Sequence, residues 1–293
     1  MKITVKGAYA FRQLGQRSNQ EDSCWPETPQ AADRVFVVCD GVGGIDKGEV
    51  ASSCVCQTLA AFFRDKDFTE HSLDMGDFEK ALHLVYDEIE KADPAHKGMG
   101  TTLTFACVNT GGVFLAHIGD SRIYQLRKDE GVVFQTEDHS LVQELVNAGI
   151  ITEEQAKTHP RKNVITRAIV AVGDGERDNA TIDIIKKVKP GDVFLLCSDG
   201  VSGTLDNQQL VEVLTADDTL ENRVKQLANQ CREAHDNNTA IVFEIGDVEA
   251  DEEADEEQLP ELEIQENIPP EMPQNAESIL EKMAKWVRNQ FNR

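Results

Sequence analysis

Two stretches of the sequence share an unusual pattern: residues 35–44 read VFVVCDGVGG, and residues 193–203 read VFLLCSDGVSG. Each begins as an apolar run that predicts a buried β-strand, and each then reaches an aspartate followed by glycine. A carboxylate at the end of a buried strand is costly unless a cation or hydrogen bonds compensate it. Two such strand ends in one chain predict that Asp40 and Asp199 are brought to a common point.

The residues around these aspartates suit a site for hard divalent cations. A glycine after each aspartate allows a tight turn and lets a backbone carbonyl approach whatever the carboxylate holds. Mg²⁺ and Mn²⁺ prefer such oxygen ligands. Three similar clusters lie beside predicted strands: Arg17–Asp22 just before the Asp40 strand, Gly119–Arg122 between two strands, and Asp236–Thr239 before the last strand. Each cluster alone is as well explained by a turn or cap, but their occurrence together beside core strands favours a metal site.

The composition of the chain limits its class. The 293 residues are 40% hydrophobic, which is enough for a substantial core, and the formal net charge of -24 disfavours binding to nucleic acid. Seven cysteines, several inside apolar runs, do not predict a disulfide scaffold, and the Cys54-x-Cys56 pair lacks the spacing of a zinc site. Since neither a signal peptide nor a membrane span is predicted, we expect a cytoplasmic protein.

Residues 1–246 alternate between strand-like and helix-like segments and predict a single α+β domain with a layered, partly antiparallel sheet structure. The expected strands are Tyr9–Gln13, Val35–Cys39, Thr102–Val108, Gly112–Ile118, Arg122–Arg127, Val132–Thr136, Thr181–Lys187, Asp192–Cys197 and Ala240–Ile245. The expected helices are Glu49–Arg64, Asp77–Ala92, Leu141–Ala148 and Leu220–Ala234.

The composition changes after Gly246. Residues 247–274 begin with a run of acids and end with three prolines within residues 267–274, so they predict a disordered, extended linker. Residues 275–293 place Ile279, Met283 and Val287 on one helical face and basic residues on the other. This pattern predicts a basic amphipathic helix, which could dock on its own domain, on a partner protein or on a membrane surface.

Seven motifs in a fixed order resemble the metal-dependent PPM, or type 2C, protein serine/threonine phosphatases, with the bacterial branch the closer match. They are RxxxED (17–22), strand-DGVGG (40–44), GMGTTL (98–103), GDSRIY (119–124), DHSLVQELVNAGIIT (138–152), strand-SDGV (198–201) and DNNT (236–239). The resemblance covers residues 1–246. It implies a four-layer α-β-β-α sandwich of two mainly antiparallel sheets flanked by helices, in agreement with the α+β prediction.

The resemblance also implies roles for individual residues. Asp40 would bridge two Mn²⁺ or Mg²⁺ ions, Glu21 and the Gly41 carbonyl would serve the second ion, and Asp199 and Asp236 the first. Asp22 would hold a metal-bound water, Asp120 would help Asp199 to hold a third, weaker ion, and Arg17 would bind the substrate phosphate. The implied activity is hydrolysis of phosphoserine and phosphothreonine on proteins, opposing a Ser/Thr kinase, by a water that bridges two ions.

Two positions complete this interpretation. Val42 stands where many eukaryotic relatives have a histidine proposed as general acid, so a metal-bound water is expected to protonate the leaving group. His139 is expected to be structural rather than catalytic. Residues 138–170 resemble the family's mobile flap, and Thr152–Gln155 predicts a capping box within it.

The same residues disfavour three competing hypotheses. A dinucleotide fingerprint requires glycine where Asp46 stands, and Asp40 would then face the pyrophosphate. A phosphatase that uses Asp40 as a covalent nucleophile requires a second aspartate at the position of Val42. An inactive, phosphatase-like binding module is disfavoured because Asp40, Asp199 and Asp236 are all present.

Overall fold

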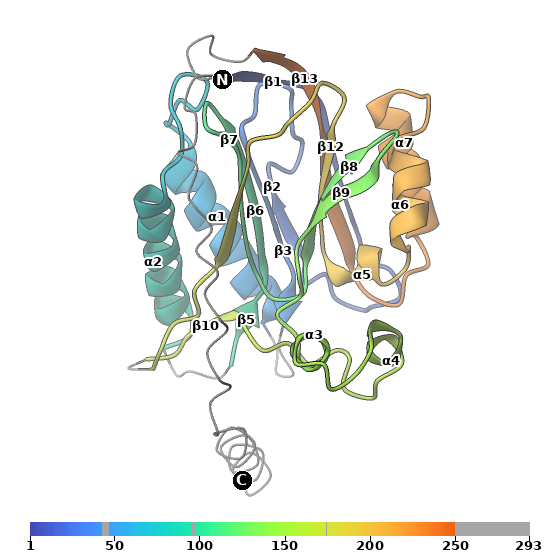
Figure 1. The fold of residues 1–293 in the computed structure, drawn as a ribbon. Helices are drawn as coiled ribbons and strands as arrows, with labels where there is room; N and C mark the ends of the chain where they lie inside the picture. The colour runs from blue at the N-terminus through green and yellow to red at the C-terminus, as the bar shows by residue number, and fades with distance from the viewer. Residues whose placement is uncertain (43–46, 95–97, 174, 250–293) are drawn as a thin grey trace, which may run out of the picture. The chain divides into compact units, whose positions relative to one another are not determined.

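Two antiparallel β-sheets of five strands each pack face to face, and helices cover the outer face of each sheet (Figure 1). The structure is a computed structural model that describes residues 1–42, 47–94, 98–173 and 175–249. The two sheets and their flanking helices confirm the predicted α+β sandwich of four layers. A small third sheet, which was not predicted, lies at one end.

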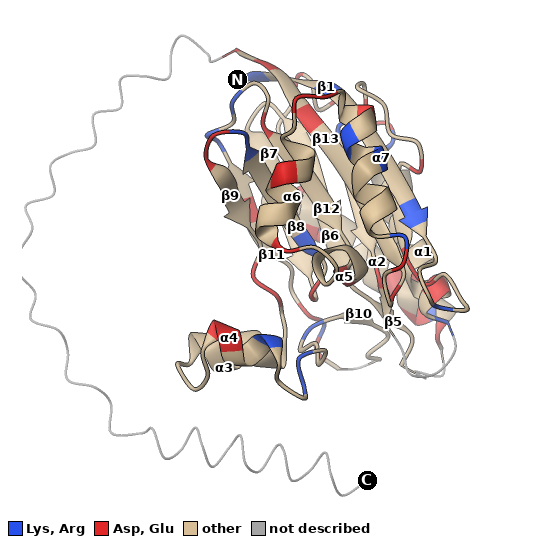
Figure 2. Cartoon of the chain, turned by 90° about the vertical axis from the view of Figure 1, so that its right-hand side faces the viewer, with Lys and Arg blue, Asp and Glu red and all other residues tan. Residues whose placement is uncertain are grey.

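The first sheet has the strand order β1-β13-β12-β8-β9, and each neighbouring pair is antiparallel. Its members are β1 (Lys2–Gln13), β8 (Arg122–Arg127), β9 (Gly131–Gln135), β12 (Val193–Cys197) and β13 (Asn238–Glu249). Helices α6 (Asn207–Leu214) and α7 (Leu220–Gln230) lie in front of this sheet in Figure 2. Leu210 and Leu227 of these helices are buried against it.

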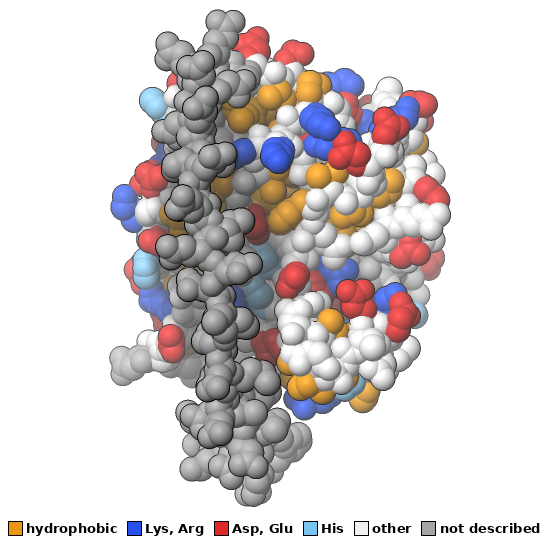
Figure 3. All heavy atoms as spheres, viewed as in Figure 1, with side chains coloured by type: hydrophobic (Ala, Val, Ile, Leu, Met, Phe, Trp, Pro, Cys, Tyr) orange, Lys and Arg blue, Asp and Glu red, His pale blue; other side chains and the backbone are white. Residues whose placement is uncertain are grey.

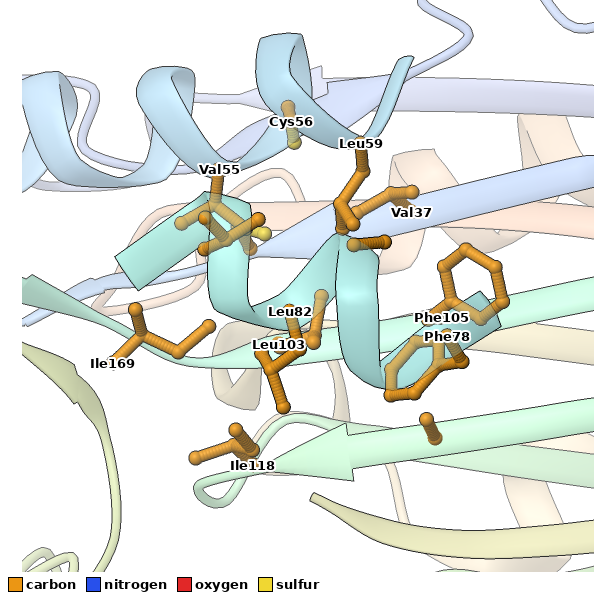
Figure 4. Packing of buried hydrophobic residues seen from close by; sticks show 14 of the residues in the cluster. Val37, Val55, Cys56, Leu59, Phe78, Leu82, Leu103, Phe105, Ile118 and Ile169 are labelled. Carbon is orange, nitrogen blue, oxygen red and sulfur yellow. The ribbon is translucent and has the colours of Figure 1, made fainter. Parts of the chain in front are cut away.

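The second sheet has the order β11-β7-β6-β3-β2 and is also antiparallel throughout. Its members are β2 (Ser23–Trp25), β3 (Val35–Cys39), β6 (Leu103–Asn109), β7 (Gly112–Ile118) and β11 (Thr181–Ile185). Helices α1 (Gly48–Phe63) and α2 (Met75–Ala92) pack on its outer face. Figure 4 shows this contact, where Val37, Leu59, Phe78 and Phe105 meet.

The remaining elements gather at one end of the sandwich. The small sheet has the order β10-β5-β4, formed by β10 (Ile169–Val170), β5 (Gly100–Thr101) and β4 (Gly41–Val42). Helices α3 (Leu141–Asn147) and α4 (Glu153–Lys157) lie beyond the same end in Figure 1. Helix α5 (Asp199–Ser202) follows β12 directly. These short elements surround the ends of β3 and β12.

The strands β3 and β12 are buried on both faces, which explains why their sequences are continuously apolar rather than alternating. Along β3, Phe36 faces the layer between the sheets, whereas Val37 faces the layer under α1 and α2. Along β12, Phe194 faces the same central layer, and Leu195 faces α6 and α7. The two similar stretches are therefore equivalent strands in facing sheets.

Aromatic stacking joins the two sheets at their centre. The ring of Phe243 on β13 stacks on Phe36 with a centroid separation of 4.5 Å and on Phe194 with a separation of 5.0 Å. All three rings are fully buried. The contact fixes β3 against β12 and β13, and with them the segments that follow.

Several predicted boundaries were wrong. The first strand begins at Lys2 rather than Tyr9. Its first residues were missed because the buried Ile3 and Val5 alternate with polar residues, two of them exposed lysines, so the segment has few apolar residues. Strand β2 and helix α6 were not predicted, since the first has three residues and the second eight. The last predicted helix ends at Gln230 instead of Ala234.

The last strand also extends the folded domain beyond its predicted end. Strand β13 continues to Glu249, three residues past the predicted boundary at 246, because Lys2 and Ile3 pair with Glu249 and Val248. The rest of the predicted linker and the predicted helix at 275–293 lie outside the described residues. Among the helices that the structure describes, none is long and apolar enough to span a membrane.

Candidate metal centre

The ends of β3 and β12 meet at the end of the sandwich where the small sheet lies. Asp40 stands between β3 and β4, where the chain passes from the second sheet into the small sheet. Asp199 is the first residue of α5. Burial raises the pKa of Asp40 and the charge of Asp199 contributes to the rise, so the two carboxyl groups lie near each other. The strand ends therefore converge, as the repeated pattern predicted.

The backbone of Asp40 is held by two buried threonines. The Asp40 N–H donates to Thr102 Oγ1 at 3.0 Å. The Asp40 carbonyl accepts from the Thr102 N–H at 2.8 Å and from the Thr101 hydroxyl at 2.7 Å. Three hydrogen bonds to the N–H and carbonyl of Asp40 leave its backbone little freedom. The sheet therefore sets the position from which the Asp40 carboxylate projects.

Gly41 brings the chain close to Glu21 and to α1. The Gly41 N–H donates to the Glu21 carbonyl at 3.1 Å, and the Ser52 hydroxyl donates to the same carbonyl at 2.5 Å. A Cβ atom at position 41 would lie 2.4 Å from the Gly48 backbone, so only glycine fits this approach. The Glu21 N–H in turn donates to Asn237 Oδ1 at 2.8 Å.

Asp22 is buried beneath the site. Its Oδ2 accepts from the Ser198 hydroxyl at 2.8 Å, and Ser198 Oγ accepts from the Thr239 N–H at 3.0 Å. Burial raises the pKa of Asp22 to about 6, although the hydrogen bond from Ser198 opposes that rise. The other oxygen, Oδ1, is buried without a hydrogen-bond partner. It is an acceptor that the protein itself leaves unsatisfied.

Asp236 and Arg17 form the more exposed side of the site. Arg17 Nη2 lies 2.6 Å from Asp236 Oδ2, and the Asn237 N–H donates to Asp236 Oδ1 at 2.8 Å. The Arg17 side chain is 54% exposed, compared with 35% for Asp236. The hydrogen bond with Asp236 raises the pKa of Arg17, and the charges of Glu21 and Asp199 add to this effect. The guanidinium is therefore close to the acidic groups and open to solvent.

Asp120 lies in the turn between β7 and β8. The pKa of Asp120 is raised to about 7, first by burial and then by the charge of Asp199. The neighbouring Ser121 hydroxyl lies 2.7 Å from Thr102 Oγ1, the atom that accepts the Asp40 N–H. Asp120 thus belongs to the same electrostatic cluster as the two strand ends.

The supporting residues were not assigned roles from the sequence. They are Ser52, Thr101, Thr102, Ser198 and Asn237, and each is buried and hydrogen-bonds Glu21, Asp22 or Asp40 directly. Four of them lie inside the motifs GMGTTL, SDGV and DNNT, so the signal was present. The motifs did not predict which residue each hydroxyl or amide would hydrogen-bond.

The comparisons with known proteins agree with this geometry. The family model for protein phosphatase 2C matches residues 13–250, which is most of the chain and nearly all of the described residues. The chain belongs to the protein phosphatase 2C family. The match begins in β1 and ends just after β13, so it contains every candidate ligand.

Relatives of this phosphatase 2C chain include curated and solved bacterial proteins. It is 30% identical over 243 residues to protein phosphatase PhpP of Streptococcus pneumoniae, covering 81% of this chain and 97% of PhpP. The crystal structure of the serine/threonine phosphatase PstP/Ppp of Mycobacterium tuberculosis superposes with a TM-score of 0.71 at 31% identity, over 83% of this chain and all of that one. A PstP catalytic domain in complex with 2 manganese ions superposes with a TM-score of 0.69 at 30% identity, over 84% of this chain and all of that one.

The charges of the phosphatase 2C site fit an ion-binding function. Burial, followed by the charges of Asp22 and Asp199, raises the pKa of Asp40 well above its ordinary value. Asp22 and Asp199 each keep one buried carboxylate oxygen without a hydrogen-bond partner. All of the candidate donors are oxygen atoms, the type preferred by Mg²⁺ and Mn²⁺. These observations fit divalent cations at this cluster.

The same side chains are not arranged as a finished coordination sphere. Within the described residues, no group of three or more acidic, His or Cys side chains is close enough to hold an ion as it stands. Asp236 is paired with Arg17 through its Oδ2. Because this contact uses an oxygen that a cation would need, cation binding at Asp236 requires the contact to open.

Val42 and His139 occupy defined places in this phosphatase 2C fold. Val42 pairs with Gly100 in the small sheet and carries no proton donor. His139 is half-buried and contacts Gly119 and Thr181, outside the carboxylate cluster. The predicted capping box is present, because Thr152 and Gln155 cap α4 reciprocally.

Proposed function

We propose a division of roles among the site residues of this metal-dependent protein serine/threonine phosphatase. Asp40 bridges two cations, Asp199 and Asp236 complete the first site, and Glu21 with the Gly41 carbonyl completes the second. Asp120 and Asp199 hold a third, weaker ion. Asp22 orients water from below, and Arg17 holds the substrate phosphate. The observation that carries this assignment is the convergence of the Asp40 and Asp199 carboxyl groups at the ends of facing strands.

The cations and the protein residues contribute different parts of the chemistry. When bound, a pair of divalent ions acidifies a water between them and offsets the charge of the phosphate. The chain's own contribution is to hold the carboxylates in place through Thr101, Thr102 and Asn237. The unpartnered Oδ1 of Asp22 supplies an acceptor for a proton of water at the base of the site.

Arg17 suits the recognition of a phosphoryl group. Its planar guanidinium can donate two parallel hydrogen bonds to phosphate oxygens, which a lysine cannot do. It is more than half exposed and lies beside the acidic cluster. A cation bound at Asp236 would compete for the carboxylate that Arg17 contacts, so we propose that Arg17 turns to the substrate when the site is loaded.

The identity of the ions and of the substrate extends this proposal. We assign Mn²⁺ or Mg²⁺ because both prefer oxygen donors. Phosphoproteins that a Ser/Thr kinase modifies are the proposed substrates, and the cytoplasm is the proposed location. Nucleic acid is not a proposed partner, since acidic and basic side chains are interspersed on the face shown in Figure 3 and the chain carries a charge of -24.

Hydrolysis of p-nitrophenyl phosphate and of a phosphothreonine peptide tests the assignment. We expect turnover only with Mn²⁺ or Mg²⁺ and none in EDTA, and we expect Asp40→Asn to abolish it. Asp129→Asn, at an exposed position between β8 and β9, is the matched control and should retain full activity. Turnover in EDTA, or full activity of Asp40→Asn, would contradict the proposal.

The C-terminal segment is tested separately. We propose that residues 275–293 dock this phosphatase on a partner protein, on a membrane or on its own domain through the basic amphipathic pattern. A chain that ends at Glu249 keeps the complete last strand and serves as the comparison. Pull-down and flotation with anionic liposomes should then separate the three alternatives, and equal behaviour of both chains would exclude the first two.

A further inference from the structure

The two ends of the flap, residues 138–170, pair with each other to form a neck. The Leu141 N–H donates to the Val164 carbonyl at 2.9 Å, and the Thr166 N–H donates to the His139 carbonyl at 2.8 Å. The neck is therefore a short stretch of paired backbone. Because His139 is part of the neck, contacts that fix His139 also fix the position at which both ends of the flap leave the domain.

His139 bonds both backbone polar groups of Gly119, the residue before Asp120. The His139 N–H donates to the Gly119 carbonyl at 2.9 Å. The Gly119 N–H donates to Nδ1 of the His139 ring at 3.1 Å. Gly119 is buried, so its N–H depends on this ring nitrogen for a partner.

The contacts of the His139 ring determine its protonation. Because Nδ1 accepts from Gly119, the proton of the neutral ring lies on Nε2, which donates to Thr181 Oγ1 at 2.9 Å. The ring stacks on His117 with a centroid separation of 4.4 Å, and Arg167 Nη1 lies 3.4 Å from Nε2. Burial, His117 and Arg167 together lower the pKa of His139 to about 4. The ring is therefore neutral, with Nδ1 free to accept.

A continuous set of contacts leads from this loop to the bridging aspartate. The Thr102 side chain packs against Gly119, and its hydroxyl lies 2.7 Å from Ser121 Oγ. The same hydroxyl accepts the Asp40 N–H at 3.0 Å. On the other side, two hydrogen bonds of 2.7 Å join Arg122 to Asp138, the residue before His139. The DHS and GDSR motifs are thus joined by hydrogen bonds of both His139 and Asp138.

We propose that His139 is a positioning residue, whose Nδ1 acceptor sets the place of the Asp120 loop relative to the neck of the flap. The loop geometry needed by Asp120 and the placement of the flap are then fixed by the same side chain. This inference rests on the proposed role of Asp120 as a ligand of the weaker ion. A ring that only filled space between His117 and Thr181 would not need an acceptor at Nδ1.

Two substitutions separate the two nitrogens. His139→Asn places an amide oxygen near the position of Nδ1 and keeps an acceptor for Gly119, whereas His139→Gln reaches toward Thr181 and leaves the Gly119 N–H without one. Thr181→Val is the matched control, because it removes the partner of Nε2 and leaves the Gly119 contact intact. The first measurement is hydrogen exchange of the Gly119 amide by NMR in the metal-free protein.

The loss of one buried hydrogen bond should accelerate exchange of the Gly119 amide in His139→Gln by about tenfold. Exchange in His139→Asn and Thr181→Val should stay within about twofold of the wild type. The second measurement is the Mn²⁺ concentration for half-maximal hydrolysis of p-nitrophenyl phosphate. It should rise about three- to tenfold in His139→Gln and stay near the wild-type value in His139→Asn.

Equal exchange rates in the Asn and Gln variants would overturn the proposal, because they would show that the Nδ1 acceptor is unimportant. Faster exchange in His139→Gln with an unchanged Mn²⁺ dependence would also overturn it, since the neck and the ion site would then be independent. A wild-type protein without phosphatase activity would contradict the proposed function instead. The exchange comparison needs neither metal nor substrate, so the two failures are distinguishable.

Discussion

The strand ends at Asp40 and Asp199 have nearly the same sequence, yet the chain continues from them in different ways. After Asp40 it stays extended and enters β4, whereas Asp199 begins α5. The difference follows from the neighbours: Thr101 and Thr102 bond the Asp40 peptide into a sheet. The Asp199 carbonyl instead accepts from the Gly203 N–H, which closes a helical turn.

The two carboxylates also differ in their electrostatic surroundings. Asp40 is surrounded by the charges of Asp22, Asp199, Asp120 and Asp236 in addition to being buried. The pKa of Asp199 is raised by burial and by the charge of Asp236, but interactions with the Asp40 carboxyl group and with the charge of Arg17 oppose the rise. Two strands with the same sequence pattern can therefore carry aspartates whose ionisation in the folded protein requires different free energies.

Asp40→Asn and Asp199→Asn should both lower phosphatase activity by at least about a thousandfold, because each removes a negatively charged ligand. In EDTA, however, both variants should be more stable than the wild type, and Asp40→Asn should gain more, since its carboxylate is the more crowded. Activity assays and thermal denaturation of the metal-free proteins measure the two effects. Equal stabilities of both variants would remove the proposed difference between the strand ends.

Glycine substitutions test the close approach that follows each aspartate. Gly41→Ala would place a Cβ 2.4 Å from the Gly48 backbone, and Gly200→Ala would place one 2.0 Å from the Asn237 carbonyl. We expect each to destabilise the fold by about 2–4 kcal/mol, measured by urea denaturation. Gly76→Ala in α2 is the control and should be neutral or slightly stabilising, because a helical alanine has no such clash. A loss at only one strand end would show that the two turns are not equivalent.

The pH dependence of stability tests the buried group that lies between the two strand ends. The pKa of Asp22 is about 6 in the folded protein, above its ordinary value, so the folded state favours the protonated form. Its contribution to stability is therefore full below about pH 4 and is lost as the pH rises to about 6, by at most about 3 kcal/mol. Thermal denaturation of metal-free wild type and Asp22→Asn from pH 4 to 8 should give curves that diverge over this range. Parallel curves would contradict the assignment.

Cys39 and Cys197 occupy equivalent places one or two residues before each aspartate, and both are fully buried. Cys39→Ala and Cys197→Ala should each cost about 1 kcal/mol through lost packing and leave kcat/KM unchanged. Urea denaturation and the peptide assay measure this. A large activity loss in either variant would show that the thiol does more than fill the core.

Much of the site could be predicted because its residues lie beside strong local signals. The apolar runs before Asp40 and Asp199 identified two buried strands, and the structure places those strands in facing sheets. The aspartate-glycine pairs identified where each strand ends. Strand β1 was predicted only in part. Its partner β13 lies more than 200 residues away in the sequence, and the β1 residues that face solvent are mostly polar.

The partners of the supporting polar groups could not be predicted for the same physical reason. The bonds from the Glu21 N–H to Asn237 and from the Ser198 hydroxyl to Asp22 join residues that are 216 and 176 positions apart. A serine or asparagine in a motif can hydrogen-bond its own turn, cap a helix or bond a residue far away in the sequence. The neighbouring sequence looks the same in all three cases, so it does not identify the partner.

By itself the sequence determined the chemical character of this protein: oxygen donors at strand ends, an arginine in a motif with acidic residues, and a core sufficient for one layered domain. Only the tertiary structure decided that the carboxyl groups of Asp40 and Asp199 come close enough to interact, that Arg17 contacts Asp236, and that His139 bonds the backbone of the loop that carries Asp120. The reason is that residue type and spacing fix what a side chain can do. Which of several similar groups it meets depends on the packing of two sheets whose strands come from opposite ends of the chain.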